Sequence, residues 1–213
     1  MALKAFTIKG IKWSGLSQVG RHILQLVTTV ILAHILSPSD FGLIAMSMVV
    51  IAFVYVFKDL GTGAAIIQKK EHSEKLLSSV FWFNVGIGTI ATGIMIVSAP
   101  LVALFFKEPG VEPIIKVLAA SVLLSAPGIL PQALLERDLK FDTLAKLELT
   151  AVLLGSLTGI GFAILGFGVW SLVYQTLVIS FFTSAFLLLS CQWRPESTFE
   201  WSQVISIGNY SFN

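Results

Sequence analysis

The feature that most constrains this chain is a succession of long apolar stretches separated by short turns. A helix that crosses a membrane needs about 20 consecutive, mostly apolar residues. Six stretches of that length follow one another: Trp13–Ile35, Phe41–Ala65, Leu77–Phe106, Val111–Leu134, Thr143–Leu165 and Val169–Cys191. The sequence therefore predicts an all-α polytopic membrane protein with six transmembrane helices.

Composition agrees with that class and excludes others. Hydrophobic residues make up 55% of the 213 residues and charged residues only 12%, whereas a soluble globular protein carries roughly 25% charged residues. The net charge of +2 is too small to indicate a nucleic-acid partner. These values exclude a disordered chain, a nucleic-acid binder with a basic face and an ordinary cytosolic enzyme. Membrane lipid is the predicted surrounding of the chain.

Little in the sequence indicates catalysis. The single cysteine, Cys191, excludes an internal disulfide, and the three histidines lack the spacing of a metal site. Most carboxylates lie in predicted loops beside basic residues. Glu148, at the start of the fifth stretch, is the exception, and we expect it at the membrane interface, with a position facing a cavity as the alternative. We predict a protein that is not an enzyme and that needs no metal or cofactor.

The turn between the first two stretches carries residues that begin helices. The sequence Ser-Pro-Ser-Asp at residues 37–40 offers Ser39 or Asp40 as the N-cap of the second helix.

The turn between the last two stretches is the shortest. Only Gly-Phe-Gly, residues 166–168, separates the fifth stretch from the sixth, so we expect these two to form a tight antiparallel hairpin. In the fifth stretch, Gly155 and Gly159 have the four-residue spacing that lets two membrane helices approach closely. The sixth helix is the expected neighbour.

Basic residues set the predicted orientation, because loops on the cytoplasmic side of a membrane are enriched in lysine and arginine. With the N-terminus inside, the outer side holds only Lys107 and Lys116. The inner side holds Lys4, Lys9, Lys12, Lys58, Lys69, Lys70, Lys75, Arg137, Lys140, Lys146 and Arg194. The predicted division is a cytoplasmic amphipathic segment at 1–12, a six-helix lobe at 13–191, and a cytoplasmic connector with the start of a seventh helix at 192–213. Both termini are expected in the cytoplasm, and the expected location of the chain is the plasma membrane, which in a bacterium is the inner membrane.

The first stretch carries the most informative polar residues. Gln18, Arg21 and Gln25 recur at helical spacing along one face, and His22 lies beside them. Polar groups lack hydrogen-bond partners in lipid, so this face is predicted to line a protein interior or a watery cavity. An arginine there suits an anionic ligand such as a diphosphate, because guanidinium binds phosphate oxygens in pairs. The alternatives are that Arg21 reaches the inner headgroups or pairs with Asp59.

Two further sets of residues have open roles. Lys58 and Asp59, near the inner end of the second stretch, either line the inner mouth of the same cavity or lie at the membrane interface. Pro127 and Pro131 predict a kink in the fourth stretch, since each removes a helical hydrogen bond. Such a kink is either a hinge for alternating access or a fixed packing feature.

Five segments of the sequence stand out by their residues and their order. They are LSPSDFGL at residues 36–43, DLG at 59–61 with IQ at 67–68, FWFN at 81–84, PQALLERDLKF at 131–141 and GFGVWSLV at 166–173. In that order they resemble landmarks of the polysaccharide flippases of the multidrug/oligosaccharidyl-lipid/polysaccharide exporter superfamily, in the branch that exports lipopolysaccharide, colanic acid and teichuronic acid.

That resemblance implies a two-lobed helical bundle about twice as long as this chain, which would form its N-terminal lobe. It also implies transport of an undecaprenyl-diphosphate-linked oligosaccharide through a central cationic cavity. Expected partners are the lipid-linked oligosaccharide, a missing C-terminal half and other polysaccharide-assembly proteins. The alternatives are a drug or metabolite antiporter of the same superfamily, a membrane enzyme of oligosaccharide assembly, and a truncated membrane protein without transport activity.

Overall fold

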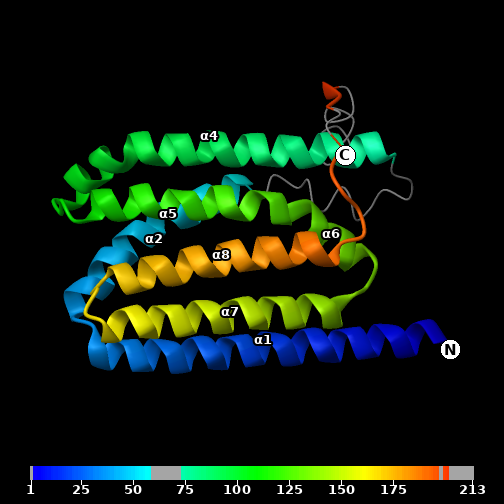
Figure 1. Ribbon diagram of the computed structural model, residues 1–213, viewed down its shortest axis with the longest axis horizontal. Helices are drawn as coiled ribbons and strands as arrows, with labels where there is room; N and C mark the ends of the chain where they lie inside the picture. The colour runs from blue at the N-terminus through cyan, green and yellow to red at the C-terminus, as the bar shows by residue number, and fades with distance from the viewer. Residues whose placement is uncertain (1, 59–72, 197–198, 202–213) are drawn as a thin grey trace.

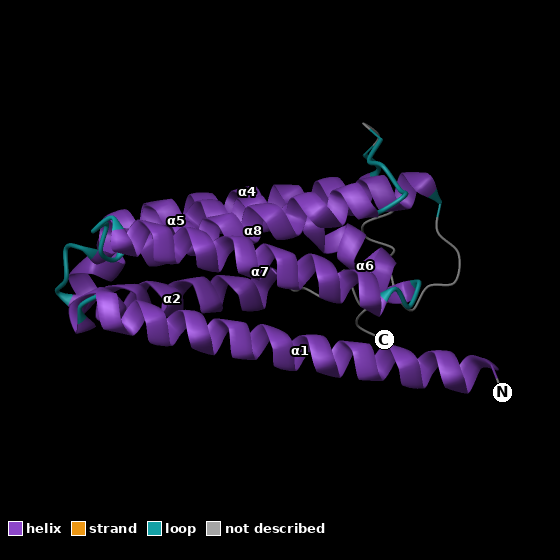
Figure 2. Ribbon diagram, turned by 60° about the horizontal axis from the view of Figure 1, so that its bottom comes forward, coloured by secondary structure: helices purple, strands orange, loops and turns teal. Residues whose placement is uncertain are grey.

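The computed structural model describes residues 2–58, 73–196 and 199–201, with side chains from Gln18 to Val54 and from Ser73 onward. All regular elements in this part of the chain are helices, and Figure 2 draws no strand there. The elements are α1 (Ala2–Ile35), α2 (Pro38–Lys58), α4 (Glu74–Phe106), α5 (Val111–Ser125), the 3-10 turn η1 (Ala126–Gly128), α6 (Ile129–Arg137), α7 (Phe141–Ile164) and α8 (Trp170–Ser190).

The helices have the length and apolarity of membrane spans. Four of the described segments qualify: α4, α7, α8, and the continuous segment Val111–Arg137, which contains α5, η1 and α6. The segment Pro38–Val54 of α2 is a shorter apolar helix. The prediction of an all-α membrane protein is confirmed. The count of six spans and the cytoplasmic location of both termini stay predictions.

The helix boundaries follow the apolar stretches closely. The predicted third, fifth and sixth spans agree with α4, α7 and α8 to within a few residues at both ends. The predicted first span ends at Ile35, as α1 does. Helix α1 is continuous from Ala2, so its backbone has no break between the predicted N-terminal segment and the first span. The predicted end of the second span at Ala65 lies outside the described residues.

The helices run side by side along the long axis of the molecule. In Figure 1 a layer contains, in order, α4, α5, α8, α7 and α1, while α2 lies behind α5. The loops α1–α2, α4–α5 and α7–α8 lie at one end, which we call the short-loop end. The start of α1, the loop from α6 to α7 and the end of α8 lie at the opposite end. This alternation is what a chain that crosses a membrane repeatedly requires.

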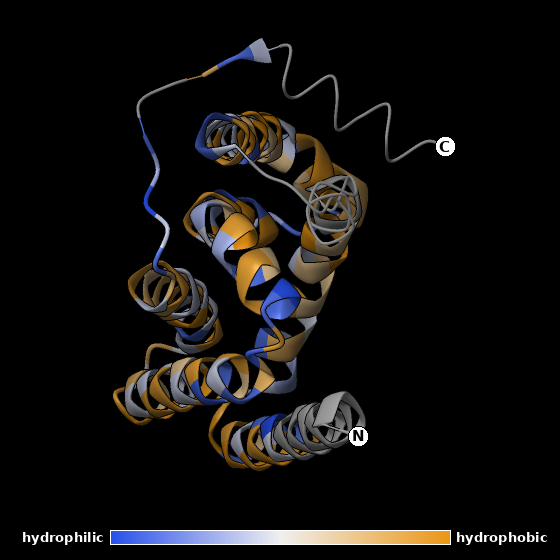
Figure 3. Ribbon diagram, turned by 90° about the vertical axis from the view of Figure 1, so that its right-hand side faces the viewer, coloured by the Kyte–Doolittle hydropathy of each residue, from blue (hydrophilic) through white to orange (hydrophobic). Residues whose placement is uncertain are grey.

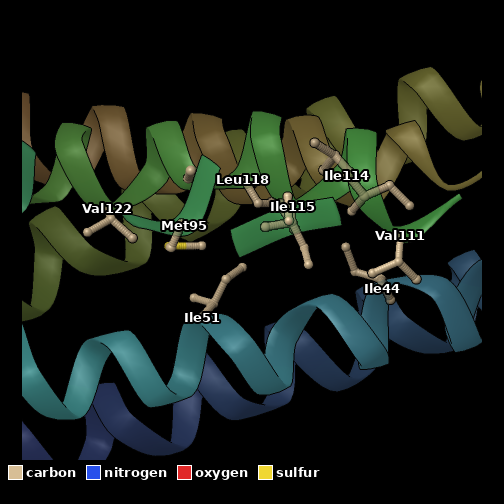
Figure 4. Close-up of a cluster of buried hydrophobic side chains, with 11 residues drawn as sticks. Ile44, Ile51, Met95, Val111, Ile114, Ile115, Leu118 and Val122 are labelled. Carbon is tan, nitrogen blue, oxygen red and sulfur yellow. The ribbon is translucent and has the colours of Figure 1, made fainter. Parts of the chain in front are cut away.

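The main core lies where α2, α4, α5 and α8 meet. Figure 4 shows Ile44 and Ile51 of α2 facing α5, with Met95 of α4 beside them. The central α5 residues Ile115 and Leu118 are fully buried. Because burial of each large aliphatic side chain contributes about 1.5–3 kcal/mol, this core holds α5 in the middle of the lobe.

The outward faces of the helices are apolar as well. Val97 and Phe105 of α4 are 77% and 80% exposed, and Leu189 of α8 is 72% exposed. The end-on view of Figure 3 shows hydrophobic ribbon on the outer sides of the helices, not only between them. Exposed apolar surface on this scale is typical of contact with lipid.

The predicted tight hairpin is confirmed in α7 and α8. Its loop turns through Gly166 and Gly168, whose φ angles of +82° and +57° suit glycine. A Cβ atom on Gly159 would lie 2.8 Å from Gln175 Oε1, and one on Gly155 would lie 3.0 Å from the Gln175 carbonyl oxygen. These two glycines therefore set the closeness of α7 to α8, the neighbour that was expected.

The N-cap of α2 differs from the prediction. Helix α2 begins at Pro38, so Ser37 takes the N-cap position. Asp40 N donates to Ser37 Oγ at 3.3 Å, and Ser37 N donates to Asp40 Oδ2 at 3.0 Å. This reciprocal pattern is a capping box. The shift has a physical reason, since proline fits the first helical position, where its missing N–H costs no hydrogen bond.

Asp40 also joins two loops at the short-loop end. Its Oδ1 accepts a hydrogen bond from Val169 N at 3.0 Å, directly before α8. A carboxylate at a helix N-terminus is stabilised by the free N–H groups and by the helix dipole. One side chain thus ties the α1–α2 loop to the α7–α8 loop, two of the segments that carry the family resemblance.

Candidate functional site

Arg21 of α1 is held at the seam between α1 and α7. Its Nη1 donates to Glu148 Oε2 at 3.1 Å, and its Nη2 donates to Gln18 Oε1 at 2.9 Å. The Arg21 and Glu148 side chains are 29% and 31% exposed. The guanidinium is thus shared between a carboxylate on a neighbouring helix and an amide on its own helix.

The pair lies well inside both helices. Glu148 is seven residues into α7, or about 10 Å at a rise of 1.5 Å per residue. Measured from the short-loop end, Arg21 is about 21 Å below Ile35 and Glu148 about 24 Å below Ile164. Glu148 therefore lies in the part of α7 nearer the opposite end, and Arg21 lies at a comparable distance from the short-loop end.

A second acidic group lies close by on α6. Gln132 Nε2 donates to Glu136 Oε1 at 2.9 Å. Helix α6 packs against α7, and the carboxylates of Glu136 and Glu148 interact electrostatically. We define the inner polar cluster as the residues from α1, α6 and α7 that meet here: Gln18, Arg21, Gln132, Glu136 and Glu148. It contains one cation and two carboxylates.

The structure brings together only some of the predicted site residues. Arg21 and Gln18 are in contact with each other. Gln25 and His22 are exposed on α1, and no described hydrogen bond joins them to Arg21. The Lys58 side chain and all of Asp59 lie outside the described residues, so the predicted alternative of an Arg21–Asp59 pair does too.

Glu148 has a partner that the sequence analysis did not name. It lies two turns inside α7, at the seam with α1, where it pairs with Arg21; its expected position at the membrane interface stays a prediction. A signal for the pairing was present in the sequence. An unpaired charge within a span is costly, so a carboxylate and an arginine at comparable depth in two spans favour each other.

The proline region forms a real break in the fourth span. Pro127 lies in the 3-10 turn η1, and Pro131 follows in α6. The break is tightly enclosed. A Cβ atom on Gly128 would lie 3.2 Å from Ser184 Cα of α8, and one on Gly88 of α4 would lie 2.6 Å from Ala126 Cβ. The predicted kink is confirmed, while a hinge role is not tested by this geometry.

The segment after α8 lies across the start of α4. Trp82 Nε1 donates to the Glu196 carbonyl oxygen at 2.9 Å, and Glu200 N donates to Ser79 Oγ at 2.9 Å. Lys75 Nζ and Glu200 Oε1 form an ion pair at 3.2 Å. These contacts give the aromatic segment at 81–84 a structural role, which is to hold the connector.

Long apolar helices joined by short loops at one end define a multi-pass α-helical membrane protein, with a half-buried charge pair where α1 meets α7. A family model described as polysaccharide biosynthesis protein matches residues 31–213. The chain belongs to that family, as the five sequence segments indicated.

Three characterised relatives show what the chain is similar to. The succinoglycan biosynthesis transport protein ExoT of Rhizobium meliloti is 31% identical over 206 residues, which are 96% of this chain and 41% of ExoT. The lipopolysaccharide biosynthesis protein WzxC of Escherichia coli is 34% identical over 73% of this chain and 32% of its own length. The teichuronic acid biosynthesis protein TuaB of Bacillus subtilis is 28% identical over 67% of this chain and 29% of TuaB.

The chain spans less than half the length of each of these relatives. No solved structure matches it.

Proposed function

We propose that this chain is the N-terminal lobe of a transporter that moves an undecaprenyl-diphosphate-linked oligosaccharide across the bacterial inner membrane for surface polysaccharide assembly. The observation that carries the proposal is the family membership, together with a relative named as a succinoglycan biosynthesis transport protein. The lipopolysaccharide and teichuronic acid relatives support the same substrate class. The remaining length of such a transporter supplies the second lobe.

Arg21 is the proposed contact for the diphosphate. It is an arginine within a span, its side chain is 29% exposed, and it is positioned from two sides by hydrogen bonds. Guanidinium N–H groups match the spacing of phosphate oxygens. Gln18, Gln25 and His22 extend the polar surface of α1 beside it, where sugar hydroxyls need donors and acceptors.

Two remaining sets of residues have secondary roles in this proposal. Lys58 and Asp59 contribute to the inner mouth of the transport path. Pro127 and Pro131 form the point at which the fourth span bends during transport.

In the proposed orientation, the inner polar cluster lies nearer the cytoplasm. Arg137 ends α6 and Lys140 lies in the loop from α6 to α7, at the end of the lobe where α1 begins. The basic residues of this end favour the cytoplasmic side. A substrate made in the cytoplasm therefore meets Arg21 early on its path.

An antiporter of the same superfamily has less support. That alternative predicts an acidic coupling residue in the first helix, and the sequence of α1 contains no aspartate or glutamate. The relatives are named for transport or polysaccharide biosynthesis, which supports a role other than catalysis for this chain.

The test replaces Arg21 in the full-length protein and measures surface polysaccharide. We expect Arg21→Ala to abolish the polysaccharide while membrane insertion, followed by a fluorescent fusion, stays normal. Arg137→Ala is the matched control, because Arg137 is the exposed last residue of α6 and its one ion pair among the described residues is a 3.6 Å contact with Asp138. Normal polysaccharide in Arg21→Ala cells would remove Arg21 from the transport path.

A further inference from the structure

We propose that Glu148 is an exchangeable counter-ion of Arg21, displaced when a diphosphate binds and able to reclaim the arginine when the ligand leaves. The proposal rests on the proposed function of Arg21 as the phosphate contact. It assigns Glu148 the task of setting how tightly the site holds its anion.

The geometry of the pair suits exchange. Glu148 accepts a hydrogen bond from only one of the two terminal nitrogens of Arg21, at 3.1 Å, and Gln18 accepts one from the other. Charge-assisted hydrogen bonds of this type are shortest at about 2.7–2.9 Å, and the strongest carboxylate pairs engage both nitrogens. The phosphate oxygens of a diphosphate can take both positions at once. The ligand then gains the paired geometry that neither Glu148 nor Gln18 supplies alone.

Partial exposure makes the exchange possible. Both side chains keep roughly a third of their surface open. A fully enclosed pair would be costly to separate, because each charge would be left without water or a partner. Here the Glu148 carboxylate can turn toward water when the arginine is engaged elsewhere.

The surrounding charges favour return of Glu148 to Arg21. The two charges that act on Glu148 are Arg21 of α1 and Glu136 of α6, and the sequence of α8 contains no charged residue. When a ligand occupies Arg21, Glu148 is left near the like charge of Glu136. Repulsion between the two carboxylates then drives Glu148 back toward the cation.

Such a counter-ion serves transport because a carrier must release what it binds. Binding has to be favourable enough for entry and weak enough for exit, as in ion pathways. An arginine without a counter-ion would hold a diphosphate more tightly. Glu148 limits that affinity while it also neutralises the arginine in the empty site.

The experiment measures the affinity of the purified full-length protein for inorganic pyrophosphate, in nanodiscs of neutral phosphatidylcholine. Glu148→Gln keeps the shape and the hydrogen-bond acceptor for Arg21 but removes the charge. We expect its dissociation constant for pyrophosphate to fall about tenfold, which corresponds to about 1.4 kcal/mol. Asp142→Asn is the matched control, since it removes the same charge from an exposed position on the same helix and should leave the affinity unchanged.

The direction of the change separates exchange from a merely structural pair. A structural pair would lose thermal stability in Glu148→Gln and bind pyrophosphate equally or more weakly. That result, with binding lost in Arg21→Ala, would overturn the counter-ion role and leave the proposed function standing. Pyrophosphate binding that survives Arg21→Ala would instead overturn the proposed function.

Two additions complete the test. If Glu148→Gln does not accumulate in the membrane, Glu136→Gln replaces it as the test variant. We expect its affinity for pyrophosphate to rise about threefold, which corresponds to about 0.7 kcal/mol. An unchanged or weaker affinity would contradict the proposal. The titration is then repeated in nanodiscs that contain phosphatidylglycerol. A gain that persists supports a diphosphate ligand, whereas a gain that disappears would assign Arg21 to phospholipid headgroups and overturn the diphosphate.

Discussion

Asp40 offers the sharpest test of how the lobe holds its short-loop end together. Its carboxylate accepts three hydrogen bonds: from Val169 N at 3.0 Å, from Ser37 N at 3.0 Å and from Ser37 Oγ at 2.6 Å. The last two stabilise the start of α2, and the first joins that start to α8. Asp40→Ala removes all three at once.

The expected loss of stability follows from these contacts. Loss of a capping interaction costs about 1 kcal/mol, and a hydrogen bond to a charged group contributes about 1.5–3 kcal/mol. Because Asp40 is only half-buried, the lower end of that range applies to Val169. We therefore expect Asp40→Ala to lower the free energy of unfolding by about 2–3 kcal/mol. For a chain of this length the melting temperature falls by about 2–4 °C per kcal/mol, or by about 4–12 °C in all.

The assay is thermal unfolding of the purified protein in detergent, followed by intrinsic tryptophan fluorescence. Asp138→Ala is the control, because Asp138 is an exposed carboxylate with contacts of only 3.6 and 3.7 Å to Arg137 and Lys140. A surface pair of this type contributes about 0–1 kcal/mol. Equal melting temperatures for the two variants would show that the Asp40 link does not stabilise the lobe.

Two further predictions concern packing and the connector. Gly159→Leu should separate α7 from α8 and reduce the folded yield severalfold in a detergent size-exclusion profile. Gly161→Leu is the control, because Gly161 faces open space and its substitution should leave the profile unchanged. Equal profiles for the two variants would refute close packing at Gly159. Trp82→Phe should keep an aromatic ring at this position but lose the hydrogen bond from the indole N–H to Glu196. Limited proteolysis should therefore cut the connector at least twofold faster than in the wild type. An unchanged rate would mean that this bond does not hold the connector.

The helices themselves could be predicted from the sequence because membrane spans depend on length and apolarity. Helix α4 ends at Phe106 and α5 begins at Val111, as the apolar stretches indicate. The α7–α8 hairpin followed from a three-residue loop, which leaves no room for any other arrangement. Local rules therefore gave the elements and the one contact that the chain connectivity enforces.

Contacts between distant helices could not be predicted in this way. The ion pair of Arg21 with Glu148 joins residues 127 positions apart, and the Asp40–Val169 hydrogen bond joins residues 129 apart. Helical periodicity identifies the face that carries Arg21 but not the helix that this face meets. That choice depends on the packing of the whole lobe, in which α1 packs mainly against α7.

The connector after α8 has a consequence for how the two edges of the helix layer communicate. Its backbone rises from α8 past α5 to the first turns of α4, where Ser79 and Trp82 hold it. Adjacent packed helices lie about 8–10 Å apart, so this path moves the chain about 20 Å sideways, to the edge of the layer opposite α1. Arg21 on α1 is linked to this connector in two ways: through α7 and α8, of which α8 continues into the connector, and through α6, which packs against both α7 and α4. The packing of these helices, more than the connector itself, determines how much of a change at Arg21 reaches Trp201.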